Sequence, residues 1–297
     1  MDKTGCIESS ENSRNCGFQL FNLDSPALPI LISVPHAGRE YPAQLLDNLR
    51  ITPVALQRLE DRYADRLVST ALASGMPAIV ASRARAWMDL NRSEDELDPE
   101  MVKGRVGERK LSGSAKMRGG LGLVPRRLLH CGDIWKYPFD IDDIEQRLDS
   151  FHRPYHHQIK HTLMQMRDRF GIALLVDIHS MPPLLPAVGF RPHIVIGDRF
   201  GQSAASLYSE VLLQRLKQIG MSAALNHPYS GDYILRRHGQ VRKNIHAIQI
   251  EVDRSLYLDS DLREPDAGLG TTSEMITELL VLLAELTRGT SMSMAAE

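Results

Sequence analysis

Two histidines and a glutamate stand where the strands of one sheet would bring them together. Each follows or lies within an apolar run of strand length: His36 follows 28–34, His179 follows 173–178 and Glu251 lies within 246–252. Open α/β sheets bind ligands beyond the carboxyl ends of their strands. A single histidine there is more often a structural hydrogen-bonding residue, but two after separate strands favour a metal site. Asp177 would share a strand face with His179 and could orient its ring.

A zinc site in a hydrolase usually takes three protein ligands from His, Asp and Glu and keeps a fourth position for water. The sequence offers two candidates for the third ligand. Glu40 comes four residues after His36 and could fold back onto the same ion, whereas Asp61 falls in a predicted helix over 52–73. One helical turn separates Asp61 from Asp65, which on spacing alone favours a solvated helix face. Residue spacing therefore leaves both candidates open.

Two further stretches combine polar side chains that could bind a substrate. In the charged run 88–99, Arg92 could form a bidentate pair with a carboxylate and Asn91 could donate a further hydrogen bond. The stretch 226–239 mixes Gly, Pro, Tyr and Arg in the manner of a substrate-contacting loop. A solvated loop explains the first stretch as well, and an ordinary surface turn explains the second.

Apolar runs of strand length alternate with amphipathic stretches along the chain. The predicted strands are 28–34, 77–81, 173–178, 193–196 and 246–252, and the predicted helices are 52–73, 140–169, 200–218 and 273–287. Pro154 should break or kink the helix over 140–169, close to His156. This alternation predicts one α/β domain over 18–287, with helices around a mainly parallel central sheet.

Three segments fall outside this pattern. Residues 1–17 and 288–297 are rich in polar or small side chains and are expected to form disordered tails. The segment 95–137 is rich in glycine and basic residues and has little periodicity. A segment of this kind is either a functional flap or a solvated insertion. Its positive charge would suit an anionic substrate.

The bulk composition excludes several classes of protein. With 297 residues, 43% of them hydrophobic, the chain can bury a full core, and its formal charge of −2 gives no basic field for nucleic acid or an anionic membrane. The apolar runs are far too short to span a bilayer, and the first residues lack the apolar region of a secretory signal. Only three cysteines occur, which favours a reducing compartment, by default the cytoplasm.

Seven blocks of sequence follow one another along the chain: SVPHAGREYP (33–42), LEDRYADRL (59–67), MDLNRSEDELDP (88–99), HRPYHH (152–157), VDIHSMPP (176–183), PYSGDYILRRHG (228–239) and HAIQIEVDRSLYLD (246–259). Together they resemble the N-formylglutamate amidohydrolase family, whose members are distantly similar to zinc carboxypeptidases. The resemblance extends over residues 30–260. It implies a phosphorylase/hydrolase-like fold, a three-layer sandwich with a mixed, mainly parallel sheet flanked by helices.

The resemblance also implies roles for the candidate residues. It makes His36 and His179 ligands of one Zn²⁺ per chain. It favours Asp61 over Glu40 as the third ligand, because the acid of the LEDRYADRL block recurs in the family. The carboxypeptidase analogy favours Glu40 instead, because there an acid shortly follows the first histidine. Glu251 matches the general base.

By the same resemblance the substrate is a small anionic N-acyl amino acid. N-formyl-L-glutamate would be cleaved to formate and L-glutamate, a step of histidine degradation. Asn91 and Arg92 match the pair that grips the α-carboxylate of the substrate. Tyr233 and Arg236 or Arg237 would contact the distal carboxylate. As a mechanistic hypothesis, Arg85 or His156 would be the cation that stabilises the oxyanion.

Two alternatives to this function are retained. The same chemistry would cleave a different N-acyl amino acid or small amide, because the segment 95–137 could reshape the pocket. A non-catalytic binding protein would keep the fold and lose the metal, but the presence of His36, His179 and Glu251 argues against it. Neither nucleic acid nor a membrane is expected as a partner, and the chain is expected to be a monomer or a small homo-oligomer.

Overall fold

The computed structural model describes residues 17–104, 111, 113–186 and 191–294. The chain divides into two compact units that alternate along the sequence. The first contains residues 1–19, 35–62 and 80–157, and the second contains residues 20–34, 63–79 and 158–297. The single domain over 18–287 stays a prediction. The predicted tail over 1–17 lies outside the described residues, apart from Gly17.

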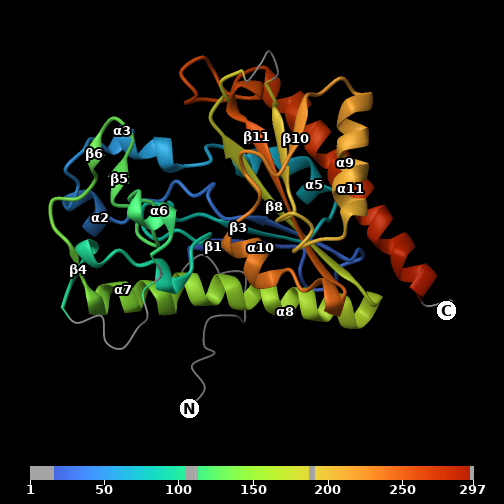
Figure 1. The fold of residues 1–297 in the computed structure, drawn as a ribbon, viewed down its shortest axis with the longest axis horizontal. Helices are drawn as coiled ribbons and strands as arrows, with labels where there is room; N and C mark the ends of the chain where they lie inside the picture. Colours follow the sequence, from blue (N-terminus) through green and yellow to red (C-terminus); the bar gives the residue numbers. More distant parts are fainter. Residues whose placement is uncertain (1–16, 105–110, 112, 187–190, 295–297) are drawn as a thin grey trace. The chain divides into compact units, whose positions relative to one another are not determined.

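A seven-stranded sheet is the largest element of the fold (Figure 1). Its strands lie in the order β1 (Phe18–Phe21), β3 (Ala78–Ala81), β2 (Ile30–Val34), β8 (Ala173–Met181), β11 (Ile245–Asp253), β9 (Ile194–Gly197) and β10 (Ala223–Leu225). The pairs β2–β8, β8–β11 and β9–β10 are parallel, whereas β9 and β11 are antiparallel. The predicted mixed, mainly parallel sheet with flanking helices is therefore confirmed.

The two central strands β8 and β11 are longer than the apolar runs that predicted them. Each has nine residues, and all of these residues are buried. The sequence predicted that the β8 strand ends at Ile178, because the polar residues His179 and Ser180 follow it. The strand continues to Met181 because β11 supplies backbone partners along its whole length. Two short strands of this sheet, β1 and β10, were not predicted, since neither contains a run of four apolar residues.

In the second unit, the C-terminal helix α11 (Gly268–Met294) packs against the sheet and against other helices. It contacts α4 (Ala64–Leu67), α5 (Ser69–Ala73) and α9 (Ser206–Gln218), as well as β2 and β8. Figure 1 shows α9 and α11 side by side. The buried residues of α11 recur at helical spacing: Ile276, Leu279, Leu280 and Leu283. In the described part of the chain, no helix combines the length and apolarity needed to cross a membrane.

The observed bounds of these helices differ from the predicted ones for local reasons. The helix predicted over 273–287 starts earlier, at Gly268, whose N–H is capped by the Asp266 carboxylate at 2.8 Å. It continues to Met294, within the tail predicted over 288–297, whose last three residues lie outside the described ones. The helix predicted over 200–218 starts later, because Arg199 and Phe200 adopt positive φ angles of 55° and 57°. The stretch 226–239, expected to be a loop, contains the short helix α10 (Tyr233–His238), which packs on β11 and β8.

The helix predicted over 52–73 was wrong in its middle. The chain forms α3 (Pro53–Leu56) and a 3-10 turn η1 (Gln57–Leu59), then leaves helical geometry before α4 and α5. Tyr63 has a positive φ of 57°, and the Asp61 N–H donates to the carbonyl of His36 at 3.0 Å. This long-range hydrogen bond replaces the helical one, so Asp61 does not share a helix face with Asp65.

The first unit contains short elements around buried side chains. Besides α3 and η1, it includes the short helices α2 (Ala43–Asp47) and α6 (Ala115–Arg118) and the 3-10 turns η2 (Glu94–Glu96) and η3 (Pro99–Met101). β4 (Val102–Lys103) pairs in parallel with β7 (Phe139–Asp140), and β5 (Arg127–Leu128) pairs antiparallel with β6 (Gly132–Asp133). Within 95–137, Leu97, Leu123, Ile134 and Trp135 are buried. The described part of this segment is therefore packed around these side chains, while residues such as Lys116, Arg118 and Leu129 are exposed. Residues 105–110 and 112 lie outside the described residues.

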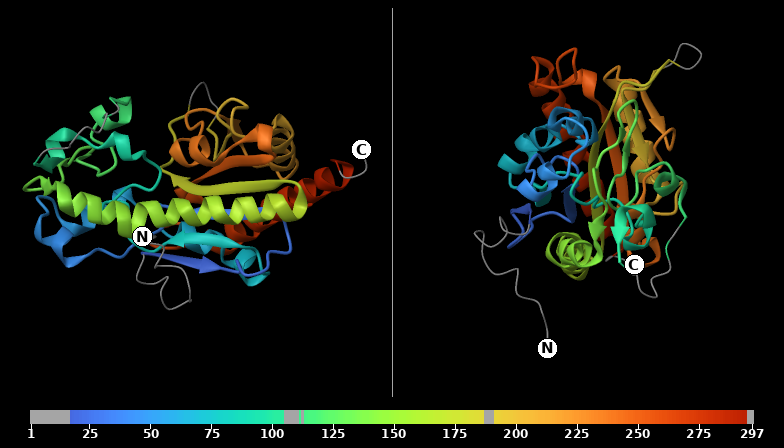
Figure 2. Two further views of the ribbon diagram at one scale, coloured as in Figure 1. Left: turned by 90° about the horizontal axis from the view of Figure 1, so that it is seen from below. Right: turned by 90° about the vertical axis from the view of Figure 1, so that its left-hand side faces the viewer.

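One long helix runs through residues 141–170, and Figure 2 shows it from two directions. It consists of α7 (Ile141–Arg147), a π-helical turn η4 (Leu148–His152) and α8 (Arg153–Phe170). Pro154 was predicted to break or kink this helix, but the helix continues through it. The π turn directly before Pro154 loosens the backbone where the proline ring would otherwise meet a carbonyl of the preceding turn.

Arg147 ends the first part of this helix and carries a buried cation. Its guanidinium carbon lies 3.8 Å from the centre of the Trp87 ring and 4.1 Å from that of Phe139. The same group pairs with the Asp143 carboxylate at 2.5 Å and donates to the Trp87 carbonyl at 3.1 Å. Packing and charge pairing therefore act on one side chain that is 1% exposed.

Replacing Arg147 by Ala should lower the free energy of unfolding by about 2–4 kcal/mol, because it removes both ring contacts and leaves a carboxylate without its cation. Urea denaturation measures this change. Arg167→Ala is the matched control, since Arg167 pairs with Asp168 at the surface, where such pairs contribute less than about 1 kcal/mol. Equal losses for the two variants would contradict the assigned role of Arg147.

Candidate metal centre and active site

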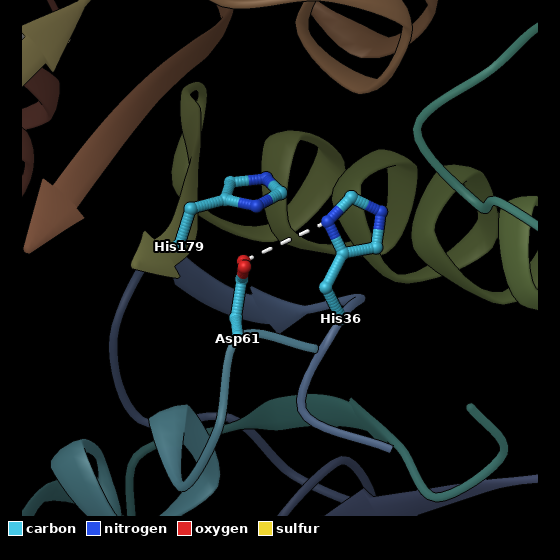
Figure 3. Close-up of side chains that lie close together, drawn as sticks. All are labelled: His36, Asp61 and His179. Carbon is cyan, nitrogen blue, oxygen red and sulfur yellow. Dashed lines mark ion pairs between the residues drawn. The ribbon is translucent and has the colours of Figure 1, made fainter. Parts of the chain in front are cut away.

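His36, Asp61 and His179 lie close together, as Figure 3 shows. Each offers one possible ligand atom, and these atoms all lie within 4.8 Å of one another. All three residues are buried, and Nδ1 of His36 is 3.6 Å from Oδ2 of Asp61. Two histidines and one carboxylate are a common ligand set for catalytic zinc. The structure thus brings together the three residues that the sequence analysis preferred as ligands.

Glu40, the alternative third ligand, is placed elsewhere. Its side chain is exposed and accepts a hydrogen bond from the Ser82 hydroxyl at 3.1 Å. Among the described residues, the group of possible metal ligands contains Asp61 and does not contain Glu40. The geometry therefore favours Asp61, although the ligand roles themselves stay predictions.

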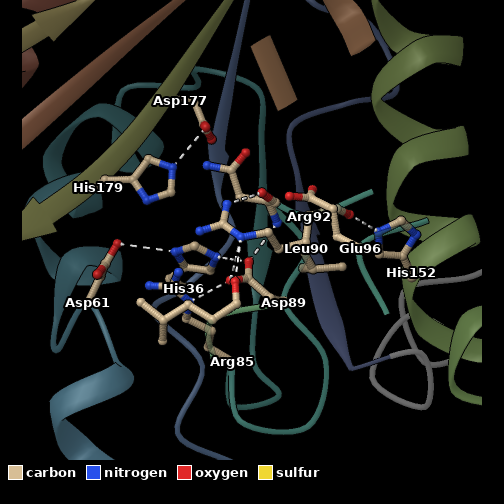
Figure 4. A network of polar contacts seen from close by, with 12 residues as sticks. His36, Asp61, Arg85, Asp89, Leu90, Arg92, Glu96, His152, Asp177 and His179 are labelled. Atoms are coloured by element: carbon tan, nitrogen blue, oxygen red, sulfur yellow. Dashed lines mark hydrogen bonds and ion pairs between the residues drawn. The ribbon is translucent and has the colours of Figure 1, made fainter. Parts of the chain in front are cut away.

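Each of the two histidines makes a hydrogen bond to a buried carboxylate (Figure 4). Nε2 of His36 lies 2.7 Å from Oδ1 of Asp89, and Nε2 of His179 lies 2.8 Å from Oδ2 of Asp177. Asp177 also accepts a hydrogen bond from the Ser33 hydroxyl at 2.7 Å. A carboxylate on Nε2 fixes that nitrogen as the protonated one and directs Nδ1 towards a ligand. This arrangement fits the role predicted for Asp177, and Asp89 plays the same part for His36.

Asp89 was not among the site residues predicted from the sequence. Its neighbours give no clear signal of burial, because an acid between the apolar residues Met88 and Leu90 is also the pattern of a half-exposed strand. In the structure Asp89 is fully buried. Burial by itself would raise the pKa of this carboxyl, but the charges of Arg85, His36 and Arg92 together hold the pKa of Asp89 well below its usual range. Asp89 is therefore an anion that can bind the ring of His36.

Arg85 and Arg92 both contribute to this local network. Nε of Arg85 donates to Asp89 at 2.8 Å. Arg92 is 2% exposed, and its guanidinium donates to the carbonyls of Leu121 at 2.9 Å and Asn91 at 2.6 Å. These contacts use Arg92 to hold backbone, which differs from the predicted bidentate grip on a substrate carboxylate. Asn91, which precedes Arg92 in the chain, donates its backbone N–H to the Asp89 carboxylate at 2.8 Å.

His156, predicted as a possible catalytic cation, is fully buried. Its Nε2 lies 3.0 Å from the carbonyl of Leu90. The neighbouring ring of His152 lies 4.5 Å away between centroids, and Nε2 of His152 lies 2.8 Å from the carbonyl of Arg92. These contacts make His156 a support for the segment 89–92. Of the two cations predicted for the oxyanion, Arg85 alone is partly exposed, at 18% of its side chain.

Glu251 lies beside His179 on the neighbouring strand. The Cα atoms of these two residues are partners in the parallel pairing of β11 with β8. Partners on adjacent strands direct their side chains to the same face of the sheet. Glu251 is 8% exposed, and one of its carboxylate oxygens accepts from the amide of Gln249 at 2.9 Å. The predicted base is thus held on the face that carries a predicted ligand.

Tyr233, Arg236 and Arg237 come together on α10. Arg237 donates to the hydroxyl of Tyr233, and the guanidinium groups of Arg236 and Arg237 each lie 5.5 Å from the centre of its ring. Both arginines are exposed. The pKa of Arg199 is lowered, first by its burial and then by the positive charge of Arg236. Arg199, which the sequence analysis did not identify, therefore adds a third cation to this cluster.

Curated relatives carry a consistent name. The N-formylglutamate deformylase of Pseudomonas putida is 30% identical over 241 residues, which cover 78% of this chain and 82% of that protein. The N-formylglutamate deformylase of Pseudomonas aeruginosa is 28% identical over 243 residues, covering 78% of this chain and 83% of that protein.

Solved structures give the same picture of the fold. The N-formylglutamate amidohydrolase of Ralstonia eutropha JMP134 is similar with a TM-score of 0.85 and 26% identity, covering 93% of this chain and 99% of that one. A gene product of Agrobacterium tumefaciens shares the fold, with a TM-score of 0.63 and 17% identity over 95% of this chain and 96% of that one. A family model described as N-formylglutamate amidohydrolase matches residues 28–258. The chain belongs to the N-formylglutamate amidohydrolase family.

Proposed function

We propose that this chain is a zinc-dependent amidohydrolase that cleaves N-formyl-L-glutamate to formate and L-glutamate. The observation that carries the proposal is the buried group His36, Asp61 and His179. Each of its histidines also makes a hydrogen bond to a second buried carboxylate, Asp89 or Asp177. The names of the Pseudomonas relatives support the substrate. The low cysteine content supports the cytoplasm as the place of action.

The donor set fits a zinc ion. His36, Asp61 and His179 would hold one Zn²⁺ per chain, because two imidazoles and a carboxylate suit this metal and leave a position for water. Asp89 and Asp177 would strengthen the histidines as ligands through their hydrogen bonds to Nε2. When bound, zinc supplies a Lewis acid that polarises the formyl carbonyl and brings the pKa of water towards about 7.

Glu251 would move the proton of the reaction. Its carboxylate takes a proton from the attacking water as the new C–O bond forms at the formyl carbon. The C–N bond then breaks, and Glu251 returns that proton to the departing nitrogen, so that formate and the free amine leave. Gln249 supports this role because its amide orients the Glu251 carboxylate. Arg85, partly exposed, would stabilise the oxyanion.

The two carboxylates of the substrate would meet different parts of the chain. Asn91 and Arg92 would lie at the α-carboxylate, with Arg92 acting mainly through the backbone it holds. Tyr233, Arg236 and Arg237 would meet the distal carboxylate, because this cluster presents two exposed guanidinium groups. The distal carboxylate of the substrate therefore matches the two cations that this cluster exposes.

Purified, zinc-quantified protein should hydrolyse N-formyl-L-glutamate with a kcat/KM at least about tenfold above that for N-acetyl-L-glutamate or N-formyl-L-leucine. The acetyl group adds a methyl at the reacting carbon, and leucine leaves the arginine cluster without an anion. Amine release measures all three reactions. A preference for another acyl group or another amino acid would keep the reaction class and exclude this substrate.

Replacing Glu251 by Gln should lower kcat by about 10²–10⁴-fold while zinc stays bound. Glutamine has nearly the same shape but cannot accept the proton of water. Stopped assays of formate release, together with metal analysis of the same sample, measure both effects. Glu278→Gln, at a half-exposed carboxylate on α11, is the matched control and should keep full activity. Activity of the Glu251 variant close to that of the wild type would exclude Glu251 as the base.

Replacing Asp61 by Asn should weaken zinc binding by more than about 100-fold, because loss of a residue that only supports a ligand already costs 10–100-fold. Glu40→Gln is the comparison and should bind zinc like the wild type, since the Glu40 side chain is exposed. Competition with a chelator measures the affinity of both variants. The opposite ranking would make Glu40 the third ligand.

A further inference from the structure

We propose that His152 and His156 are positioning residues that fix the segment 89–92 for substrate binding. The first step is their own placement. Both side chains are fully buried, four residues apart on the long helix, so they share one face. Their ring centroids lie 4.5 Å apart with an interplanar angle of 57°. The two rings thus form one packed pair, which we call the histidine pair.

The histidine pair holds two alternate carbonyls of the segment. Nε2 of His156 lies 3.0 Å from the carbonyl of Leu90, and Nε2 of His152 lies 2.8 Å from the carbonyl of Arg92. A carbonyl can only accept, so each Nε2 carries a proton and donates it. Asn91 stands between the two held carbonyls. The peptide group that joins Leu90 to Asn91 cannot rotate without breaking the buried hydrogen bond to His156, and the one after Arg92 cannot rotate without breaking the bond to His152.

The held segment carries the groups that the site needs. Asp89 binds the ring of His36 at 2.7 Å, and the Asn91 N–H closes onto the same carboxylate at 2.8 Å. Figure 4 shows the histidine His152 and the network of Asp89 in one view. Because the backbone of Leu90 and Arg92 is held, the direction in which the Asn91 Cα–Cβ bond leaves the backbone is held too. This step rests on the proposed function, in which Asn91 contacts the substrate's α-carboxylate.

The helix geometry gives a second, independent observation. The π-helical turn Leu148–His152 ends at the first member of the pair. Such turns are less stable than regular α-helix and are found frequently at functional sites. Here the turn lies where the helix changes from Arg147, which packs on Trp87, to the histidines that hold 90 and 92. The helix therefore packs against Trp87 before the π-helical turn and holds the segment 89–92 after it.

The test uses the zinc-loaded full chain with His152→Leu, His156→Leu and the corresponding Gln variants. Leucine fills space but donates nothing, whereas the Gln amide can still donate to a carbonyl. His246→Leu is the matched control, because His246 is also buried and its ring accepts from the Ala205 N–H at 3.3 Å. Steady-state kinetics on N-formyl-L-glutamate, zinc content and thermal unfolding are measured for all variants.

Both Leu variants should raise KM about tenfold with zinc content unchanged and kcat within about threefold, and the Gln variants should recover most of the loss. The control should lower only the thermal stability. A KM that is unchanged, or changed equally in His246→Leu, would overturn the proposal and leave the pair as ordinary core residues.

Amide hydrogen exchange over residues 88–93 reads the same positioning without a substrate. The Leu variants should speed exchange there relative to the control, because the segment loses its anchors. If the wild type does not hydrolyse N-formyl-L-glutamate, the proposed function fails independently of this result. Faster exchange in the Leu variants would then show that the histidine pair anchors the segment but has no part in binding this substrate. Unchanged exchange would show that the pair does not anchor the segment.

Discussion

Parallel pairing of β8 with β11 sets the position of the polar groups on the sheet. Nine consecutive residue pairs are in register, and they put Glu251 beside His179 and Gln249 beside Asp177. A shift of one residue would turn every side chain of a strand to the opposite face. The placement of a base beside a metal ligand therefore depends on backbone hydrogen bonds along two buried strands, before any side chain makes a contact.

Buried carboxylates are the second constraint, and the structure satisfies each one locally. Asp89 and Asp177 are both fully buried, where an isolated charge would be very costly. Asp177 is met by His179 and the Ser33 hydroxyl. Asp89 is met by His36, two backbone or side-chain N–H groups and the charge of Arg92. Each histidine is consequently oriented by a buried carboxylate, and this carboxylate cannot move away without losing the hydrogen bonds that compensate its burial.

Much of the fold and part of the site follow from the sequence. Continuous apolar runs predicted five strands, and the polar residues that follow or lie within them led to His36, His179 and Glu251. The resemblance favoured Asp61, but the helix predicted around it was wrong. The hydrogen bond from the Asp61 N–H to the His36 carbonyl interrupts that helix, and a long-range contact of this kind leaves no local pattern in the sequence. The structural contact of His156, which was predicted as a possible catalytic cation, is hidden from the sequence for the same reason. Its partner is the carbonyl of Leu90, 66 residues away, which spacing cannot reveal.

The charged run 88–99 shows why such a region is hard to interpret from composition. It has the residue types of a solvated loop, yet Asp89, Asn91, Arg92, Glu96 and Asp98 are all buried. Each is paired within the fold: Glu96 accepts from the Ser93 N–H in a capping box, and Asp98 pairs with Arg126 at 2.7 Å. Hydrogen bonds therefore act together with the buried apolar side chains of Met88, Leu90 and Leu97 to keep this region in place. Each of these contacts restrains the backbone or a side chain of the run, so its polar composition serves to position Asp89 and Asn91.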